Sequence, residues 1–409
     1  MNKKIKLLVV PSDYFGGVGR FRSIEPHTYI QEHYGDEFQV DIVFMKDFPQ
    51  DLSSFLSQYD LIHMHKQFDK NMVIMNTIKF LGIPVILDLD DHFSLGPDHP
   101  MYLTSKKEKW ADTILKHVKM ADAVTTTTPL FADVLRKYNK NVYVLPNAIN
   151  PENPQFSEKK NKSERMRFGI VCGSAHLKDI ELLEGISSLP KEIRDKMQIV
   201  LCGFDLNGTT TIFNRQTGEV TRRPIYPHES VWTKYEQILT DNYKNLSPEH
   251  VSFLKKYMAH IDDPFTDDYY RRMCTREIQR YATHYENVDV LLAPLKENDF
   301  NYVKSQLKVI EAGFTGCAII AQNYGPYKLD LRPYIIKGGQ IDQEGNGLLV
   351  ESRKNHKEWA KYIRYCVEHP EDVERMKENL KKTVQGEYSL ENITKKRVEL
   401  YKKILSKEN

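Results

Sequence analysis

The chain has 409 residues, of which 40% are hydrophobic and 28% are charged. This length exceeds what one hydrophobic core supports, because cores stop growing at about 250–300 residues, so we expect two domains. The composition is that of a compact globular protein and argues against intrinsic disorder. The net charge of +2 is too small to indicate nucleic-acid binding. An anionic ligand would therefore have to be bound by a local cluster of positively charged groups.

No apolar run approaches the roughly 18–20 residues of a membrane-spanning helix, and the N-terminus lacks the apolar region of a secretory signal. We therefore expect a cytosolic protein. Residues 395–407 are basic, with apolar side chains at helical spacing, so peripheral contact with the inner face of an anionic membrane stays open. A solvated helix that packs its apolar stripe on the body of the protein is the commoner arrangement. The five cysteines are widely spaced and odd in number, which favours reduced packing residues over disulfides or a zinc site.

Residues 1–150 alternate short β-branched runs with charged helical stretches, which is typical of a parallel sheet covered by helices. The pattern predicts one doubly wound domain. Its expected strands are 4–10, 40–45, 61–64, 84–89, 123–126 and 142–145, and its expected helices are 20–34, 70–81, 106–120 and 129–138.

A polar stretch at 151–165 is the expected linker to a second domain, which covers 166–387. Strands at 167–172, 198–203, 288–293 and 317–321, with helices at 179–186 and 304–314, predict a second parallel sheet. The distance between strands over about 204–285 is too long for one crossover. We interpret it as an insertion with a hairpin at 209–224 followed by helices. The segment 388–409 contains a last helix, which could pack back on the first domain.

The segment 298–314 is the most informative in the chain. Its predicted helix buries one face and aligns Lys304, Lys308 and Glu311 on a neighbouring face. The helix follows a strand at the carboxyl edge of a parallel sheet, where open α/β folds place their ligands. Free backbone N–H groups and the helix dipole favour a phosphate near Lys304 and Ser305, while Glu311 is placed to accept hydrogen bonds from ribose hydroxyls. A surface helix with a Lys308–Glu311 ion pair is the alternative.

This segment, followed by a Gly-Pro-Tyr run at 325–327 and a Gly-Asn-Gly-Leu-Leu-Val run at 345–350, resembles the donor domain of retaining GT-B glycosyltransferases (group 1, or family 4-like). A Pro-Asn-Ala-Ile run at 146–149 extends the resemblance over most of the chain. It implies two Rossmann-like domains with a central cleft, a nucleoside-diphosphate sugar donor, a carbohydrate-type acceptor and a place in polysaccharide biosynthesis. The family's ribose-binding glutamate maps onto Glu311. Its sugar-contacting glutamate, eight residues earlier, is replaced by Val303, whereas Lys304-Ser305 matches one branch of the family.

A second phosphate candidate follows the first strand of the second domain, at Gly173, Ser174, His176 and Lys178. Glycine lets the backbone approach a ligand, and histidine and lysine are natural partners of a diphosphate. The family commonly has an arginine where this chain has Ser174, so a plain strand-to-helix turn capped by Ser174 is the alternative. The full predicted donor-binding set is Gly173, Ser174, His176, Lys178, Asn301, Lys304, Ser305, Lys308 and Glu311.

In the first domain, Gly16, Gly17 and Gly19 follow the first strand, but their spacing is not the dinucleotide fingerprint, which disfavours NAD binding. The resemblance places this loop at the cleft. Asp90 and Asp91 follow another strand and could bind acceptor hydroxyls or help to remove a proton.

His65 is a further acid-base candidate, although a histidine this close to a core is more often structural. Lys304 would stabilise negative charge on the leaving diphosphate. The predicted catalytic set is therefore Asp90, Asp91, His65 and Lys304. The Asp-x-Asp spacing also allows a metal, but the resemblance implies none, so we expect neither a metal nor a cofactor.

Two other functions stay open at this point. A non-catalytic nucleotide-sugar-binding subunit would account for the absent glutamate and arginine, and a sugar-nucleotide epimerase has the same architecture. The sequence leaves the donor sugar, the base, the acceptor and the oligomeric state undefined.

Overall fold

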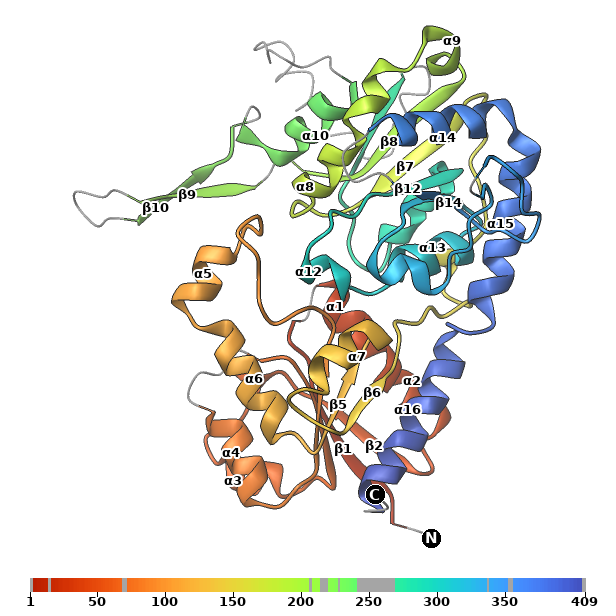
Figure 1. The fold of residues 1–409 in the computed structure, drawn as a ribbon. Helices are drawn as coiled ribbons and strands as arrows, with labels where there is room; N and C mark the ends of the chain where they lie inside the picture. The colour runs from red at the N-terminus through yellow and green to blue at the C-terminus, as the bar shows by residue number, and fades with distance from the viewer. Residues whose placement is uncertain are drawn as a thin grey trace.

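Two parallel six-stranded sheets, each flanked by helices, form the two lobes of the molecule in a computed structural model (Figure 1). The structure describes residues 3–13, 16–67, 72–205, 208–213, 220–226, 229–240, 269–336, 338–351 and 356–406. The predicted α/β fold with two doubly wound sheets is confirmed.

The first sheet and its helices make up the N-terminal lobe. The strand order is β2-β1-β3-β4-β5-β6, and all neighbouring strands are parallel. Strands β3 and β4 are buried at every residue, because helices cover both faces of the sheet. The strands are β1 (Ile5–Val10), β2 (Phe38–Ile42), β3 (Leu61–His65), β4 (Val85–Leu89), β5 (Ala123–Thr126) and β6 (Val142–Val144). The helices are α1 (Gly17–Gly19), the π-helix η1 (Arg20–Ile24), α2 (Glu25–His33), η2 (Met45–Asp47), α3 (Leu52–Leu56), α4 (Val73–Phe80), α5 (Tyr102–Lys107), α6 (Trp110–Met120) and α7 (Pro129–Leu135).

The second sheet, in the C-terminal lobe, has the strand order β11-β8-β7-β12-β13-β14 and is also parallel throughout. Its strands are β7 (Met166–Val171), β8 (Met197–Phe204), β11 (Tyr270–Cys274), β12 (Val290–Ala293), β13 (Ala318–Gln322) and β14 (Leu348–Val350). Its helices are α8 (Leu177–Ile180), η4 (Glu181–Ser188), α9 (Lys191–Arg194), α10 (Val231–Thr240), η6 (Tyr281–Asn287), α12 (Asp299–Tyr302), α13 (Leu307–Phe314), η7 (Gly325–Leu329), α14 (Lys357–Glu368) and α15 (Pro370–Gln385). The short helix η3 (Pro154–Phe156) lies between the two sheets in sequence.

Several predicted helices are divided or shortened in the structure. The helix expected over 106–120 is broken between α5 and α6, where Lys109 has a positive φ of 52°. The helix expected over 20–34 consists of η1 and α2. The helix expected over 304–314 was wrong at its start, because α13 begins only at Leu307 and Lys304 lies between α12 and α13.

The region interpreted as an insertion contains both expected and unexpected structure. The predicted hairpin is confirmed as the antiparallel pair β9 (Thr209–Phe213) and β10 (Val220–Pro224), while its turn lies outside the described residues. Strand β11 was expected to be helical, and the helices expected over 241–268 also lie outside the described residues. Strand β11 pairs with β8 and forms the edge of the second sheet.

The last helix, α16 (Leu390–Leu405), leaves the C-terminal lobe and lies beside α2 of the N-terminal lobe (Figure 1). Val398 and Tyr401 are buried in one cluster with Leu7 and Val9 of β1. The hydroxyl of Tyr401 also lies 2.7 Å from Nε2 of His27, whose pKa is lowered to about 3 by burial. The apolar stripe of this basic helix is thus covered by the first sheet. Within the described ranges, each helix is too short or too polar to cross a lipid bilayer.

Truncating Tyr401 tests how much α16 stabilises the N-terminal lobe. We expect Tyr401→Ala to lower the free energy of unfolding by about 3–5 kcal/mol, because it leaves a cavity and removes a partner of buried His27. The urea midpoint measures this change. Exposed Lys395 on the same helix is the control, and Lys395→Ala should shift the free energy by no more than about 0.5 kcal/mol. Equal midpoints for both variants would contradict the expectation.

Candidate functional site

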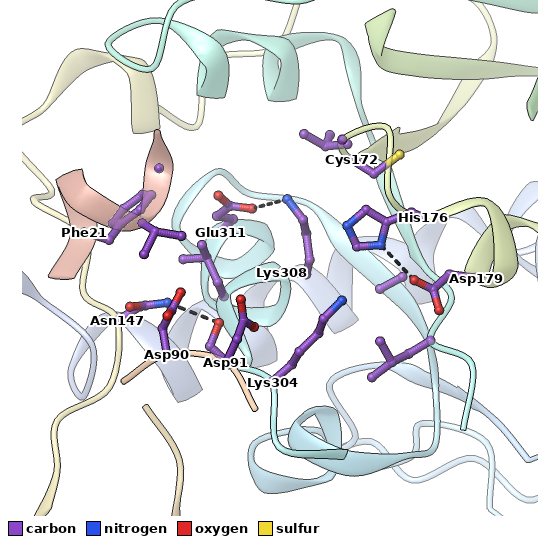
Figure 2. A pocket seen from close by; sticks show the side chains of 18 of the residues that line it. Phe21, Asp90, Asp91, Asn147, Cys172, His176, Asp179, Lys304, Lys308 and Glu311 are labelled. Atoms are coloured by element: carbon purple, nitrogen blue, oxygen red, sulfur yellow. Dashed lines mark hydrogen bonds and ion pairs between the residues drawn. The ribbon is translucent and has the colours of Figure 1, made fainter. Parts of the chain in front are cut away.

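A cavity of about 540 Å³ lies between the two lobes and is lined by residues of both (Figure 2). In each sheet, the first strand has its next strand in sequence on one side and a later strand on the other side. This topological switch point lies between β1 and β3 in one lobe and between β7 and β12 in the other. Open α/β sheets bind ligands outside the carboxyl ends of strands at such switch points. Gly17 follows β1, Gly173 follows β7, and both line the cavity.

Glu311 is a deeply buried charged group of the cavity wall, with 1% of its surface exposed. Its carboxylate accepts hydrogen bonds from the hydroxyl of Tyr281, from the hydroxyl of Tyr285 at 2.6 Å and from Nζ of Lys308 at 2.8 Å. Burial and the neighbouring carboxylate raise the pKa of Tyr285 well above its ordinary value, so this phenol stays a donor. A carboxylate has about four acceptor sites, and these three donors leave one for a ligand hydroxyl.

Lys304, Lys308 and His176 surround one part of the cavity (Figure 2). Nδ1 of His176 lies 2.8 Å from a carboxylate oxygen of Asp179, which orients the ring. The amine of Lys304 lies 5.1 Å from the centroid of the Phe300 ring. The backbone N–H of Lys304 donates to the carbonyl of Asn301, so it is not one of the free donors that the sequence suggested. The amines of Lys304 and Lys308, and not a free helix N-terminus, are therefore the groups of this wall that could hold an anion.

The N-terminal lobe contributes two carboxylates, Asp90 and Asp91. Asp90 accepts from Nζ of Lys66 at 2.7 Å and lies 3.2 Å from Nε2 of His65. Burial by itself would raise the pKa of Asp90, but the charge of Lys66 and the contact with His65 hold it below its ordinary value. Asp90 therefore stays ionised and is a weak base. Asp91 is more exposed, and its carboxylate is 3.7 Å from Lys66.

Arg22 begins a chain of hydrogen bonds that reaches the C-terminal lobe through Asn147. Its guanidinium donates two hydrogen bonds to Asp88, at 2.9 and 2.6 Å, and one to the carbonyl of Leu145 at 2.7 Å. It also donates to Oδ1 of Asn147 at 3.2 Å, and Nδ2 of Asn147 donates to Oγ of Ser305 at 3.1 Å. A chain of hydrogen bonds thus runs from β4 of the first sheet to the loop before α13.

Val303 occupies the position at which the resembling family carries a sugar-contacting glutamate. Its side chain is buried in the hydrophobic core of the N-terminal lobe, with 1% exposed, and it does not line the cavity. The hydroxyl of Thr128 donates to the carbonyl of Val303 at 3.5 Å. In this chain the position joins the two lobes.

The structure brings most of the predicted site residues to this one cavity. Those that line it are Gly17, Asp90, Asp91, Gly173, His176, Lys304, Ser305, Lys308 and Glu311.

Three predicted donor-binding residues lie outside the cavity. Ser174 is exposed, and Lys178 pairs with Glu181 at 2.8 Å and lines a neighbouring cavity. Asn301 is buried and donates to Asp179 at 3.1 Å, so it holds the wall from behind. Sequence spacing placed these residues near the ligand but did not show which way they point.

The remaining three predicted residues also lie outside the cavity wall. Gly16 and Gly19 donate their backbone N–H groups to Asp13, so they shape the loop and leave only Gly17 at the cavity. His65 is fully buried behind Asp90. It acts on the site through that carboxylate and does not reach a ligand in the cavity directly.

Several residues with clear roles carried no prediction. Tyr281 and Tyr285 hold Glu311, and Arg22 and Asn147 connect the lobes. The two tyrosines are four residues apart and precede a buried strand. This spacing could have predicted that they share one face of a helix. Arg22 follows the glycine loop, but its partner Asp88 is 66 residues away and could not be identified from spacing.

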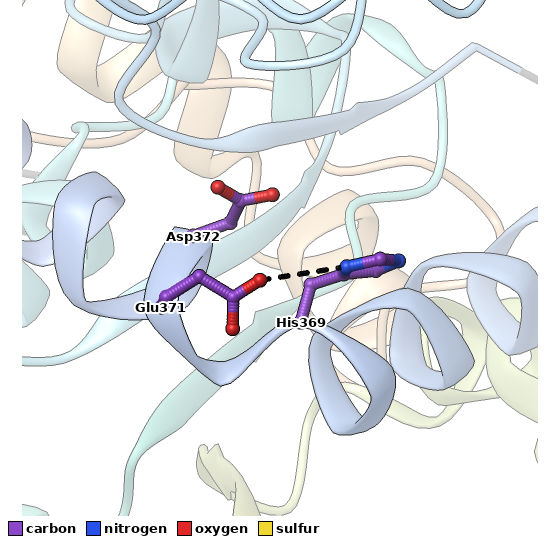
Figure 3. Close-up of side chains that lie close together, drawn as sticks. All are labelled: His369, Glu371 and Asp372. Carbon is purple, nitrogen blue, oxygen red and sulfur yellow. Dashed lines mark ion pairs between the residues drawn. The ribbon is translucent and has the colours of Figure 1, made fainter.

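One group of possible metal ligands occurs among the described residues, at His369, Glu371 and Asp372 (Figure 3). Asp372 already accepts hydrogen bonds from Tyr334 at 2.7 Å and Arg375 at 3.1 Å. The group stands at the start of α15, and none of the three residues lines the cavity. It is best described as a surface ion-pair cluster.

No family model matches the sequence, and no curated protein is similar to it in sequence. Solved structures share its fold over the whole chain. Sucrose-phosphate synthase from Thermosynechococcus elongatus is 15% identical, with a TM-score of 0.62 over 98% of this chain and 100% of that chain. HepE from Anabaena, in complex with UDP, is 12% identical, with a TM-score of 0.56 over 97% and 99%. A protein from Listeria monocytogenes described as a UDP-N-acetylglucosamine 2-epimerase is 10% identical, with a TM-score of 0.55 over 100% and 98%. The chain therefore has the two-lobed GT-B fold that the sequence predicts.

The buried Arg22–Asp88 pair makes stability depend on pH. Burial would raise the pKa of Asp88, but Arg22 holds it below its ordinary value, so the pair stabilises the folded state above about pH 4 and less as the pH falls below that value. We expect Asp88→Asn to cost about 3–5 kcal/mol at pH 7, because it leaves buried Arg22 without its counter-charge. Urea midpoints between pH 7 and pH 3 should fall more steeply for the wild type than for the variant.

The exposed pair of Asp133 and Arg136 provides the matched control, since Asp133 is 71% exposed. Asp133→Asn should change the free energy by less than about 1 kcal/mol and keep the wild-type pH profile. Parallel pH profiles for wild type and Asp88→Asn would show that the pair is not the source of the acid sensitivity.

Proposed function

We propose that the chain is a glycosyltransferase that moves a sugar from a nucleoside-diphosphate sugar to a carbohydrate-type acceptor, with retention of the anomeric configuration. The observation that carries this proposal is the convergence of Glu311, Lys304, Lys308 and His176 in one cavity between two opposed switch points. Its volume of about 540 Å³ lies within the usual range for small-molecule sites.

Different parts of the cavity wall would hold the ribose and the diphosphate of such a donor. Glu311 has one acceptor site left for a ribose hydroxyl, and Tyr281 and Tyr285 fix its orientation. Lys304 and His176 lie where a diphosphate would be held, and Gly173 offers backbone without a side chain. Lys308 now pairs with Glu311 at 2.8 Å and could share its charge with a phosphate oxygen.

Breaking the sugar–phosphate bond places negative charge on the leaving diphosphate. Lys304, Lys308 and His176 would stabilise this charge more strongly in the transition state than in the ground state. We assign no metal or cofactor to this step, because the side chains of the wall can supply the positive charge. Asp91 would orient the attacking hydroxyl, with Asp90 and His65 behind it.

The comparisons support a nucleotide ligand of this kind. HepE, which shares the fold, was solved with UDP, with UDP and glucose, and with UDP-glucose. The epimerase described above shares the fold too, so turnover of the donor without transfer is the second candidate.

Nucleotide binding is the direct test. A panel of UDP, ADP, GDP and their glucose derivatives should include at least one ligand that raises the melting temperature of the wild type, because a ligand that binds only the folded state stabilises it. Lys304→Ala and Glu311→Ala should each weaken that ligand about 10- to 100-fold by calorimetry, since each removes a hydrogen bond to or from a charged group. Exposed Lys361 and Glu374 are controls, and Lys361→Ala and Glu374→Ala should leave the affinity unchanged.

The product of turnover separates the candidate functions. Slow release of nucleoside diphosphate together with free or transferred sugar supports a transferase, and NMR of the glycoside reports the anomeric configuration. Conversion of one nucleotide sugar into its epimer would identify an epimerase. Tight nucleotide-sugar binding without turnover in the presence of any acceptor would indicate a binding subunit. If no ligand of the panel bound, the proposal would be refuted.

A further inference from the structure

A second cavity of about 320 Å³ adjoins the first, and Asp179 and Lys304 line both. Residues 92–99, which follow β4 in the N-terminal lobe, form one wall, and Lys178 together with the segment 298–301 forms the other. The amine of Lys296 lies 2.7 Å from a carboxylate oxygen of Asp98, which ties the two walls together. A molecule in this cavity would therefore contact both lobes and lie next to Lys304.

The second cavity is lined by charged groups of both signs, and its exposed carboxylate Asp299 is opposite in sign to Lys304. Lys178 pairs with Glu181, and Asp98 pairs with Lys296. Asp179 accepts from the backbone N–H of Lys296 at 2.7 Å and from Nδ2 of Asn301 at 3.1 Å. In the larger cavity, by contrast, the side chains of Lys304, Lys308 and His176 lie together on one wall. The second cavity thus suits a ligand that both donates and accepts hydrogen bonds and carries no net charge.

An aromatic surface stands where the two cavities meet. The ring of Phe300 lines the second cavity, with the ring of His99 at 5.2 Å and the amine of Lys304 at 5.1 Å from its centroid. Burial and the charge of Lys304 lower the pKa of His99, so its ring is neutral at pH 7. Nδ1 of His99 accepts from the backbone N–H of Met101 at 3.1 Å, which leaves the ring hydrogen on Nε2 as a donor.

We propose that the second cavity binds the acceptor as a neutral, polyhydroxylated sugar, with Phe300 as the surface on which the sugar ring packs and His99 as a hydrogen-bond donor. The inference rests on the proposed function and names the substrate class of its second site. The C–H groups of a sugar carry partial positive charge and pack on the negative face of an aromatic ring, while its hydroxyls meet the polar groups around that ring.

The transfer then balances without another reactant. The acceptor hydroxyl oxygen bonds to the anomeric carbon as the bond from that carbon to the phosphate oxygen breaks. The electron pair of the broken bond stays on the phosphate oxygen, beside Lys304, and the hydroxyl proton passes to the departing diphosphate. The position of Lys304 in both cavities places this exchange at their junction.

Saturation-transfer NMR on the full chain, saturated with the nucleotide that the binding panel selects, tests the site. The probes are the methyl glycosides of glucose, galactose, mannose and N-acetylglucosamine, with glucose 1-phosphate and inorganic phosphate as anionic counterparts. We expect at least one methyl glycoside to bind and both Phe300→Leu and His99→Ala to weaken it about three- to tenfold. Phe300→Leu keeps apolar volume and removes only the aromatic face.

Tyr302 is the matched control, because it lies on the same helix, is 42% exposed and lines neither cavity. Tyr302→Leu should keep glycoside affinity within twofold of wild type and should keep nucleotide affinity. The nucleotide is held at a saturating concentration for every variant, because Phe300→Leu also removes the ring beside the amine of Lys304. Equal glycoside affinity in wild type and Phe300→Leu, no binding by any methyl glycoside, or tighter binding of the phosphates would each overturn the inference. Failure of every nucleotide to bind the wild type would count against the proposed function instead, since nucleotide binding is measured without a glycoside.

Discussion

The buried cation Arg22 organises the region between the two sheets of this molecule. Its guanidinium is almost fully enclosed and contacts two chain segments that are distant in sequence, one at Asp88 and one at Leu145 and Asn147. Such a charge is tolerated in the interior only when its hydrogen bonds are satisfied and its counter-ion is fixed. The carboxyl end of β4 and the chain leaving β6 must therefore keep their relative positions. The same requirement aims Asn147 at Ser305, so the shape of the cavity between the lobes depends on the core of one of them.

The order of strands and helices could be predicted from sequence wherever local patterns decide the structure. Buried parallel strands such as β12 are continuous apolar runs, and these were identified with small errors at their ends. Strand β11 was missed because its two central arginines do not form such a run, and its pairing with β8 supplies what its own sequence lacks. The start of α13 was misplaced because the contact of Val303 with the other lobe interrupts the helical spacing.

In the candidate site, too, features set by local sequence could be predicted and features set by long-range packing could not. Lys304, Lys308 and Glu311 were identified because helical spacing and a strand edge are local features. The direction of the Lys178 side chain depends on an ion pair with Glu181, and the burial of His65 depends on strands to either side of it. Tyr285 could be assigned to Glu311 only through the fold, which packs η6 and α13 in one hydrophobic cluster against the second sheet. Local chemistry thus predicted the wall of the cavity, and long-range packing decided which side chains reach it.

The valine at position 303 has a consequence for motion. A glutamate at this position would be well solvated when the lobes separate. Val303 is instead buried in the hydrophobic core of the opposite lobe. Each separation would return this side chain to solvent, at a cost of about 1.5–3 kcal/mol, and would also break the hydrogen bond between Asn147 and Ser305. The hydrophobic contact of Val303 thus favours the closed arrangement of the two lobes. The rate at which ligands enter and leave the cavity would then depend on how often this contact breaks.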